Sequence, residues 1–110
     1  MEAARIVLIS APDLETGERL AREMVEQRLA ACVSGLPGAF SIYRWQGKVE
    51  RANEVLLIAK TDAARVPELM AWLEGAHPYD VPECIAIAPI ELSPRYRQWL
   101  ELETRAEADS

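Results

Sequence analysis

Two apolar runs without polar alternation constrain the fold of this chain more than any other feature of its sequence. Residues 5–10 read Arg-Ile-Val-Leu-Ile-Ser, and residues 53–60 read Asn-Glu-Val-Leu-Leu-Ile-Ala-Lys. Strands that are solvated on one face alternate between apolar and polar residues, whereas strands buried on both faces do not. Both runs are therefore predicted to be strands of a sheet that is shielded from water on its two faces.

Capping and turn signals predict the elements around these strands. Asp13 is suited to cap a helix whose apolar face runs from Leu14 to Leu29. Pro67 fits only the first turn of a second helix over residues 66–73, and Ser93-Pro94 opens a short last helix. An apolar run at 30–36 leads to a turn or bulge at 37–38. An alternating strand at 40–45 then forms part of a long hairpin at 41–50, with a tight turn at 46–47. A stiff loop at 77–83 precedes an edge or bulged strand at 84–90.

The order strand, helix, strand, strand, helix, strand, with a final helix, predicts an α+β fold of the ferredoxin-like βαββαβ type. Right-handed crossovers place both main helices on one face of an antiparallel sheet. One chain has too few helices to cover the second apolar face, so self-association is expected to cover it. The 110 residues are assigned to a single domain, with a charged tail after about residue 103 that is expected to fray.

Composition argues against several classes of function. The net charge is −6 and the pI about 4.8, and a nucleic-acid partner is not expected because phosphate binding needs a basic stripe. The sequence contains no run of about 18 apolar residues and no pattern of a secretory leader, so a cytoplasmic protein without a membrane span is expected. Cys32 and Cys84 lie in apolar surroundings and are predicted to be reduced, without zinc-site spacing.

Four segments carry a resemblance to a known family. They are Arg-Leu-Ala-Ala-Cys-Val at 28–33, Ser-Ile-Tyr-Arg-Trp-Gln-Gly-Lys at 41–48, Leu-Ile-Ala-Lys-Thr at 57–61 and His-Pro-Tyr-Asp-Val-Pro-Glu at 77–83. In this order the chain resembles the CutA divalent-cation tolerance proteins over residues 7–100. The resemblance implies a ferredoxin-like subunit in a tight homotrimer, similar in architecture to the PII signalling proteins. It also implies a role in tolerance of copper and other divalent cations, with no enzymatic reaction and no required cofactor.

The resemblance also implies a set of copper ligands, of which this chain keeps only His77. The positions that align with a cysteine and a second histidine in some relatives hold Ser10 and Ala76. A single imidazole rarely makes a tight transition-metal site. His77 is therefore interpreted in three ways: it orders its turn by hydrogen bonds, it serves as a weak ligand for Cu²⁺ or another divalent cation, or it takes part in acid–base chemistry.

A cleft between subunits is the candidate binding site. Tyr43 and Trp45 project from the same face of the hairpin, either to pack against a neighbouring subunit or to wall a cleft for a small ligand. Lys60 ends an apolar strand, and Glu83 is its expected counter-ion. Cys32 is interpreted as a packing residue, as a soft Cu(I) ligand or as a reactive thiol. The candidate inter-subunit cleft comprises Cys32, Tyr43, Trp45, Lys60, His77, Tyr79 and Glu83.

Three functions remain open on this sequence. The favoured one is a trimeric divalent-cation tolerance or response protein that binds or signals at its inter-subunit clefts. The second is a structural partner on which another protein assembles. The third is a small hydrolase on the same fold, which would need an arginine in the loop after the first strand. Residues 11–15 are acidic and contain no arginine, so no enzymatic activity is expected.

Overall fold

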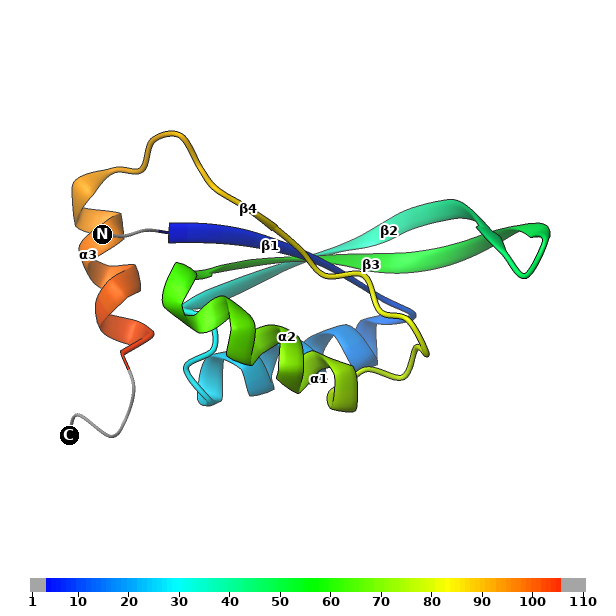
Figure 1. Cartoon of the computed structure of the whole chain (residues 1–110), viewed down its shortest axis with the longest axis horizontal. Helices are drawn as coiled ribbons and strands as arrows, with labels where there is room; N and C mark the ends of the chain where they lie inside the picture. The colour runs from blue at the N-terminus through cyan, green and yellow to red at the C-terminus, as the bar shows by residue number, and fades with distance from the viewer. Residues whose placement is uncertain (1–3, 106–110) are drawn as a thin grey trace.

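The structure, a computed structural model, describes residues 4–105, and these residues form a mixed α+β fold (Figure 1). Its strands are β1 (Ala4–Ala11), β2 (Cys32–Trp45), β3 (Lys48–Asp62) and β4 (Ile85–Ile87). Its helices are α1 (Leu14–Glu26), α2 (Val66–Ala76), which follows the 3₁₀ turn η1 (Ala63–Arg65), and α3 (Pro94–Glu103). The strands pair antiparallel in the order β2-β3-β1-β4, which confirms the predicted ferredoxin-like topology.

The hydrophobic core lies between the sheet and the helices α1 and α2, which cover the same face (Figure 1). Alternate residues of β1 and β3, among them Ile9 and Leu57, are fully buried beneath these helices. Leu20 and Met24 of α1 and Leu69 of α2 close the core from the other side. Burial of each large apolar side chain contributes about 1.5–3 kcal/mol, so this layer is the main source of stability.

Helix α1 begins where the sequence predicts but ends earlier. The carboxylate of Asp13 accepts a hydrogen bond of 2.8 Å from the backbone N–H of Thr16, and this cap lowers the pKa of Asp13. The helix ends at Glu26 rather than near Leu29, because Arg28 adopts a φ of 61°. Leu29 still reaches the core from the turn that follows.

The β2–β3 hairpin is longer than the sequence pattern indicates. Strand β2 continues through residues 37–38, where a turn or bulge was predicted, and contains 14 residues, and β3 begins at Lys48 rather than at Asn53. The predicted limits were wrong because exposed polar residues of β3, such as Glu50 and Arg51, are held by pairing with β2 and not by burial.

Two irregularities shape this hairpin as the sequence predicts. The register shifts between Leu36 and Ala39, where Gly38 has a φ of 88°, so the Pro-Gly pair forms a bulge and not a turn. Gln46 and Gly47 form the tight turn at the tip, with φ values of 50° and 82°. Positive φ at both central residues matches the twist of the two strands and keeps them paired up to the turn.

Strand β4 differs from the prediction, and only the first two residues of the predicted tail are described. Strand β4 has three residues instead of the seven predicted at 84–90, and Pro89 has no N–H with which to extend the ladder on β1. Thr104 is buried, and its hydroxyl donates a hydrogen bond of 2.9 Å to the carbonyl of Leu100. The rest of the predicted tail, after residue 105, lies outside the described residues.

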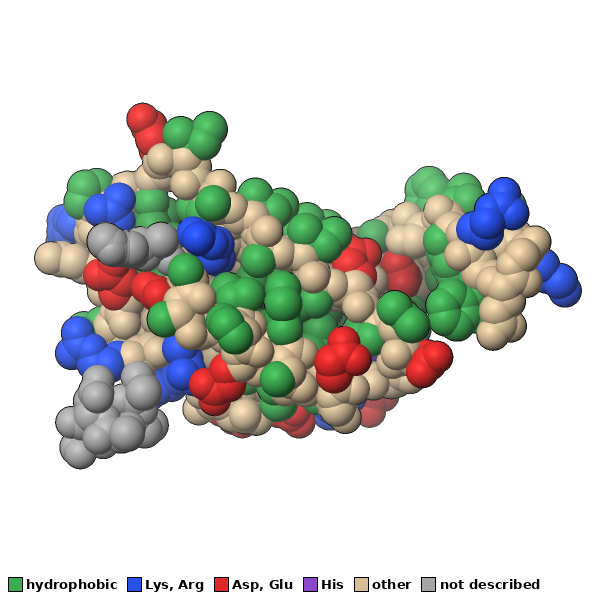
Figure 2. Space-filling view, in the orientation of Figure 1, with side chains coloured by type: hydrophobic (Ala, Val, Ile, Leu, Met, Phe, Trp, Pro, Cys, Tyr) green, Lys and Arg blue, Asp and Glu red, His purple; other side chains and the backbone are tan. Residues whose placement is uncertain are grey.

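The sheet face turned away from α1 and α2, here named the open face, is apolar and incompletely covered. Helix α3 packs at one end of the sheet, near the start of β1 (Figure 1). Hydrophobic side chains gather along the hairpin and beside β4 (Figure 2). The strand register places six apolar residues on the open face: Ile6, Leu8, Leu56, Ile58, Ile85 and Ile87. All six are partly or fully exposed in the single chain, as expected for a sheet with helices on one face.

Candidate functional site

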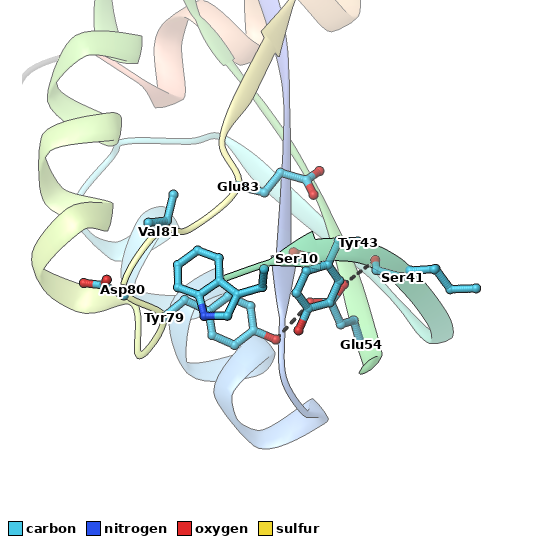
Figure 3. A pocket seen from close by; sticks show the side chains of 10 residues that line it. Ser10, Ser41, Tyr43, Glu54, Tyr79, Asp80, Val81 and Glu83 are labelled. Atoms are coloured by element: carbon cyan, nitrogen blue, oxygen red, sulfur yellow. Dashed lines mark hydrogen bonds between the residues drawn. The ribbon is translucent and has the colours of Figure 1, made fainter. Parts of the chain in front are cut away.

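A pocket of about 590 Å³ lies where the base of the hairpin meets the loop that follows α2 (Figure 3). This hollow separates the hairpin from the body of the molecule in the space-filling view (Figure 2). Its volume is in the range of pockets that bind small organic molecules. The pocket is lined by Ser10 of β1, by Ser41, Ile42, Tyr43 and Trp45 of β2, by Glu54 of β3, and by Tyr79, Asp80, Val81 and Glu83 of the loop.

Glu54 accepts the hydrogen bonds that tie the walls of the pocket together. The residue is only 8% exposed. The hydroxyl of Tyr79 donates to its Oε2 over 2.9 Å, and the hydroxyl of Ser41 donates to its Oε1 over 2.5 Å. Burial and the bond to Glu54 raise the pKa of Tyr79, so the phenol keeps its proton and acts as the donor. The carboxylate of Glu54, on β3, therefore links β2 to the loop that follows α2.

His77 directly follows α2 at the start of the loop and does not line the pocket. It is 7% exposed, and its Nε2 is 2.7 Å from the backbone oxygen of Ser10. The N–H of Tyr79 donates to its Nδ1 over 3.0 Å. A carbonyl only accepts and an amide N–H only donates, so the ring carries its proton on Nε2 and uses Nδ1 as acceptor. Both nitrogens are engaged, which supports the interpretation that His77 orders the turn.

The structure brings four of the seven predicted cleft residues together around one pocket. Tyr43 and Trp45 come from the hairpin, and Tyr79 and Glu83 come from the loop. His77 supports the pocket indirectly, because its ring contacts that of Tyr79 with centroids 4.7 Å apart and an angle of 50° between the ring planes.

The other two predicted cleft residues, Cys32 and Lys60, lie elsewhere in the chain. They are register partners on β2 and β3 and do not line the pocket. The ammonium group of Lys60 donates to the hydroxyl of Ser34 over 2.7 Å and to the carbonyl of Ile58 over 3.3 Å. Within the single chain, the partners of Lys60 are thus oxygen atoms of β2 and β3 and not the carboxylate of Glu83.

The described residues do not form a metal centre. Between residues 4 and 105, the structure contains no group of three or more His, Cys, Asp or Glu side chains that could hold a metal ion. Both cysteines are free thiols. Burial, with smaller contributions from the carboxylates of Glu74 and Glu83, raises the pKa of the Cys84 thiol. Because the thiolate is the form that binds metals, Cys84 is a poor ligand near neutral pH.

Sequence reasoning missed the residue at the centre of the site. The sequence pattern places Glu54 within the apolar strand predicted at 53–60 and assigns it no functional role. The available signal was an acidic residue directly before Val-Leu-Leu-Ile in a run predicted to be buried, because a carboxylate in such a position requires hydrogen-bond donors. Its two donors, Ser41 and Tyr79, are 13 and 25 residues away along the chain, and no local pattern connects them to it.

Comparison with known proteins agrees with this fold. The family model described as CutA1 divalent ion tolerance protein matches residues 5–103. The divalent-cation tolerance protein CutA of Thermus thermophilus is 43% identical over 99 residues, which cover 90% of this chain and 96% of that protein. The crystal structure of CutA from Xylella fastidiosa is similar with a TM-score of 0.91 and 41% identity, and the match covers 94% of this chain and 99% of that one.

A plant relative shows that the same domain also occurs in longer chains. The chloroplastic CutA of Arabidopsis thaliana is 41% identical over 100 residues, which are 91% of this chain and 55% of that protein. This chain therefore spans about half the length of the plant relative. In the described part of the chain, no helix is both long and apolar enough to cross a membrane. The family match, the identity over most of both chains and the shared fold agree, and the chain belongs to the CutA1 divalent ion tolerance family.

Proposed function

We propose that this protein acts in divalent-cation tolerance or response, and that it works as a homotrimer which binds its ligands at clefts between subunits. Membership of the CutA1 family supports the cation-related role. The main support for the proposed trimer is the open face of the sheet, where apolar residues such as Ile85 and Ile87 remain exposed in the single chain. Contiguous apolar patches that are exposed on a single chain mark sites of association.

The β2–β3 hairpin is the element suited to reach a neighbouring subunit. It projects from the body and makes the molecule 47 Å long but only 28 Å and 22 Å in its other dimensions (Figure 1). Its exposed apolar side chains include Phe40, Ile42 and Val49. Strands β2 and β4 are the edges of the sheet, and their outer backbone groups are free to pair with another chain. A closed trimer would pair these edges and cover the open face at the same time.

Light scattering coupled to size-exclusion chromatography tests this assembly. One chain has a mass of 12.3 kDa, and the expected species has three times that mass throughout a dilution series in the micromolar range. The mass should persist in the presence of a chelator, because the open-face side chains that are proposed to associate are apolar. A single compact species of 12.3 kDa would overturn the proposal.

A structural partner role is the second candidate, and one exposed segment favours it. Ile90, in the loop between β4 and α3, is 98% exposed. It is not part of the open face, so covering that face would leave it available to a different protein. Capture of partners from native lysate, with and without added copper, separates the two functions. A partner captured only with copper favours the response role, and one captured under both conditions favours the platform role.

No enzymatic reaction is part of the proposal. The family is named for cation tolerance and not for a reaction. In the loop after β1, Asp13 caps α1, and no arginine is available there to stabilise an oxyanion. The hydrolase considered from the sequence therefore has no support from this loop.

A further inference from the structure

We propose that the pocket at the base of the hairpin binds a small organic cation, an ammonium group attached to an apolar or aromatic part, in preference to a bare metal ion. The inference rests on the proposed function, because it names the class of ligand for the cleft at which that function places binding. It is carried by three properties of the pocket: the sign of its charges, its aromatic walls and the distribution of its carboxylates.

The charged side chains that line the pocket are all acidic. They are Glu54, Asp80 and Glu83, and the lining includes no lysine, arginine or histidine. Within residues 4–105, the hydrogen-bond partners of Glu54 are the neutral hydroxyls of Ser41 and Tyr79. A carboxylate that is almost fully buried therefore has no cationic partner in the described chain. Burial of an unpaired charge is costly, and a cationic ligand in the pocket would offset that cost.

Aromatic rings provide a second means of recognising a cation. Tyr43, Trp45 and Tyr79 line the same pocket, and the rings of Tyr43 and Tyr79 lie beside the carboxylate of Glu54 (Figure 3). The faces of aromatic rings carry partial negative charge and attract ammonium groups. Ile42 and Val81 add apolar surface for the hydrocarbon part of a ligand. The combination suits a cation that is itself partly apolar.

The distribution of the carboxylates argues against a bare metal ion. A divalent ion gives up its hydration water only to several oxygen atoms that converge on one point at about 2.0–2.6 Å. In the described part of the chain, the acidic side chains do not form such a group. They are instead distributed around a cavity of about 590 Å³, which has the size of a small-molecule pocket. An organic cation has a larger radius and can contact separate carboxylates and rings together.

Calorimetric titration with two probes of similar shape tests the proposal. Benzylammonium and benzyl alcohol differ mainly in charge, and we expect benzylammonium to bind at least about tenfold more tightly. The variants Glu83→Gln and Trp45→Leu should each weaken binding of benzylammonium about three- to tenfold, since each removes one of the proposed contacts. Glu91→Gln is the matched control, because it removes one acidic charge outside the pocket, and it should leave the affinity unchanged.

Several outcomes would overturn this inference. Equal affinity for the two probes, or no binding of benzylammonium at millimolar concentration, would show that the pocket does not select cations. An equal loss of affinity in Glu91→Gln and Glu83→Gln would assign the effect to the overall acidic charge. A Cu²⁺ affinity that falls in Glu83→Gln would assign the pocket to a metal.

The oligomeric state of the same samples keeps this inference separate from the proposed function. All residues that the structure places around the pocket belong to one chain, and the proposed trimer would add a neighbouring subunit beside it, so ligand preference and oligomeric state are recorded as two separate readouts. A trimer that does not bind benzylammonium contradicts only the ligand class. A monomer that binds benzylammonium selectively contradicts only the assembly.

Discussion

At the scale of single residues, Tyr79 is the best-anchored side chain of the candidate site. Its backbone N–H donates to His77, and its hydroxyl donates to Glu54. The two acceptors are themselves buried and belong to different elements. Tyr79 is thus held through both its backbone N–H and its side-chain hydroxyl. These two hydrogen bonds fix the loop and keep the pocket open in the absence of a ligand. Preformed pockets of this kind lose less conformational entropy when they bind.

The first prediction concerns His77→Ala. The substitution removes the donor to the carbonyl of Ser10 and the acceptor of the N–H of Tyr79, and it leaves a cavity. We expect a loss of about 2–4 kcal/mol in the free energy of unfolding, measured by chemical denaturation at fixed protein concentration. His77→Gln, whose side chain still contains a donor and an acceptor, should lose less.

Copper binding distinguishes a structural His77 from a ligand. Because both ring nitrogens are engaged, calorimetric titration with Cu²⁺ should give the same affinity for the wild type and for His77→Gln. A marked loss of Cu²⁺ affinity in a variant that remains folded would restore His77 as a metal ligand.

The sequence revealed the aromatic half of the site more readily than the acidic half. Tyr43, Trp45 and Tyr79 were found because they belong to distinctive motifs of the hairpin and the loop. Lys60 was assigned to the same cleft, although it is six residues from Glu54 along β3, a distance of about 20 Å at 3.3 Å per residue. The sequence gives this separation but not which end of β3 the loop after α2 lies against, and the contact of Tyr79 with Glu54 places that loop away from Lys60.

At the scale of elements, periodicity predicted the order of the strands and helices but not the length of the strands. The core-facing elements were found because burial imposes a pattern on their residues. The outer hairpin is exposed on both faces, and its length depends on pairing from the tight turn at Gln46-Gly47 back to the bulge. Strand β4 was predicted too long because apolar residues near Pro89 indicate a strand, whereas proline prevents the pairing that would form it.

The second prediction tests the bulge of the hairpin by replacing Gly38 with alanine. An added Cβ would meet nothing within 4 Å, so any effect must come from the backbone, which has a φ of 88° at this residue. We expect a loss of about 1–2 kcal/mol in the free energy of unfolding, measured by denaturant titration, because this conformation is strained for residues with a side chain.

Gly75→Ala is the matched control for Gly38→Ala. Gly75 also has open space around it, but it lies in α2 and has no positive φ. Alanine should stabilise this position by about 0.5–1 kcal/mol, since glycine is the poorer helix former. Effects of the same sign and size at the two sites would contradict the assignment of strain to Gly38.

At the scale of the whole molecule, the chain is built asymmetrically. Helices α1 and α2 cover one face of the sheet, while the open face and the projecting hairpin remain exposed (Figure 1). The apolar runs in the sequence indicated this arrangement, because they were too apolar for strands with one solvated face. They could not indicate which surfaces meet, because that depends on the shape of the folded subunit. Proposed trimer formation accounts for both the open face and the unpaired edges with a single interface.

The last prediction tests this asymmetry by placing one charge on each side of the molecule. Ile87 lies on the open face and is 44% exposed, whereas Leu14 lies at the start of α1 and is 51% exposed. Both positions should accept glutamate in the single chain, because both are already in contact with water. In the proposed trimer, only Ile87→Glu would bury an unpaired carboxylate, at a cost of several kcal/mol for each subunit. Light scattering should therefore show a shift of Ile87→Glu toward 12.3 kDa, while Leu14→Glu keeps the wild-type mass. If both variants keep the wild-type mass, the open face is not the surface through which the subunits associate.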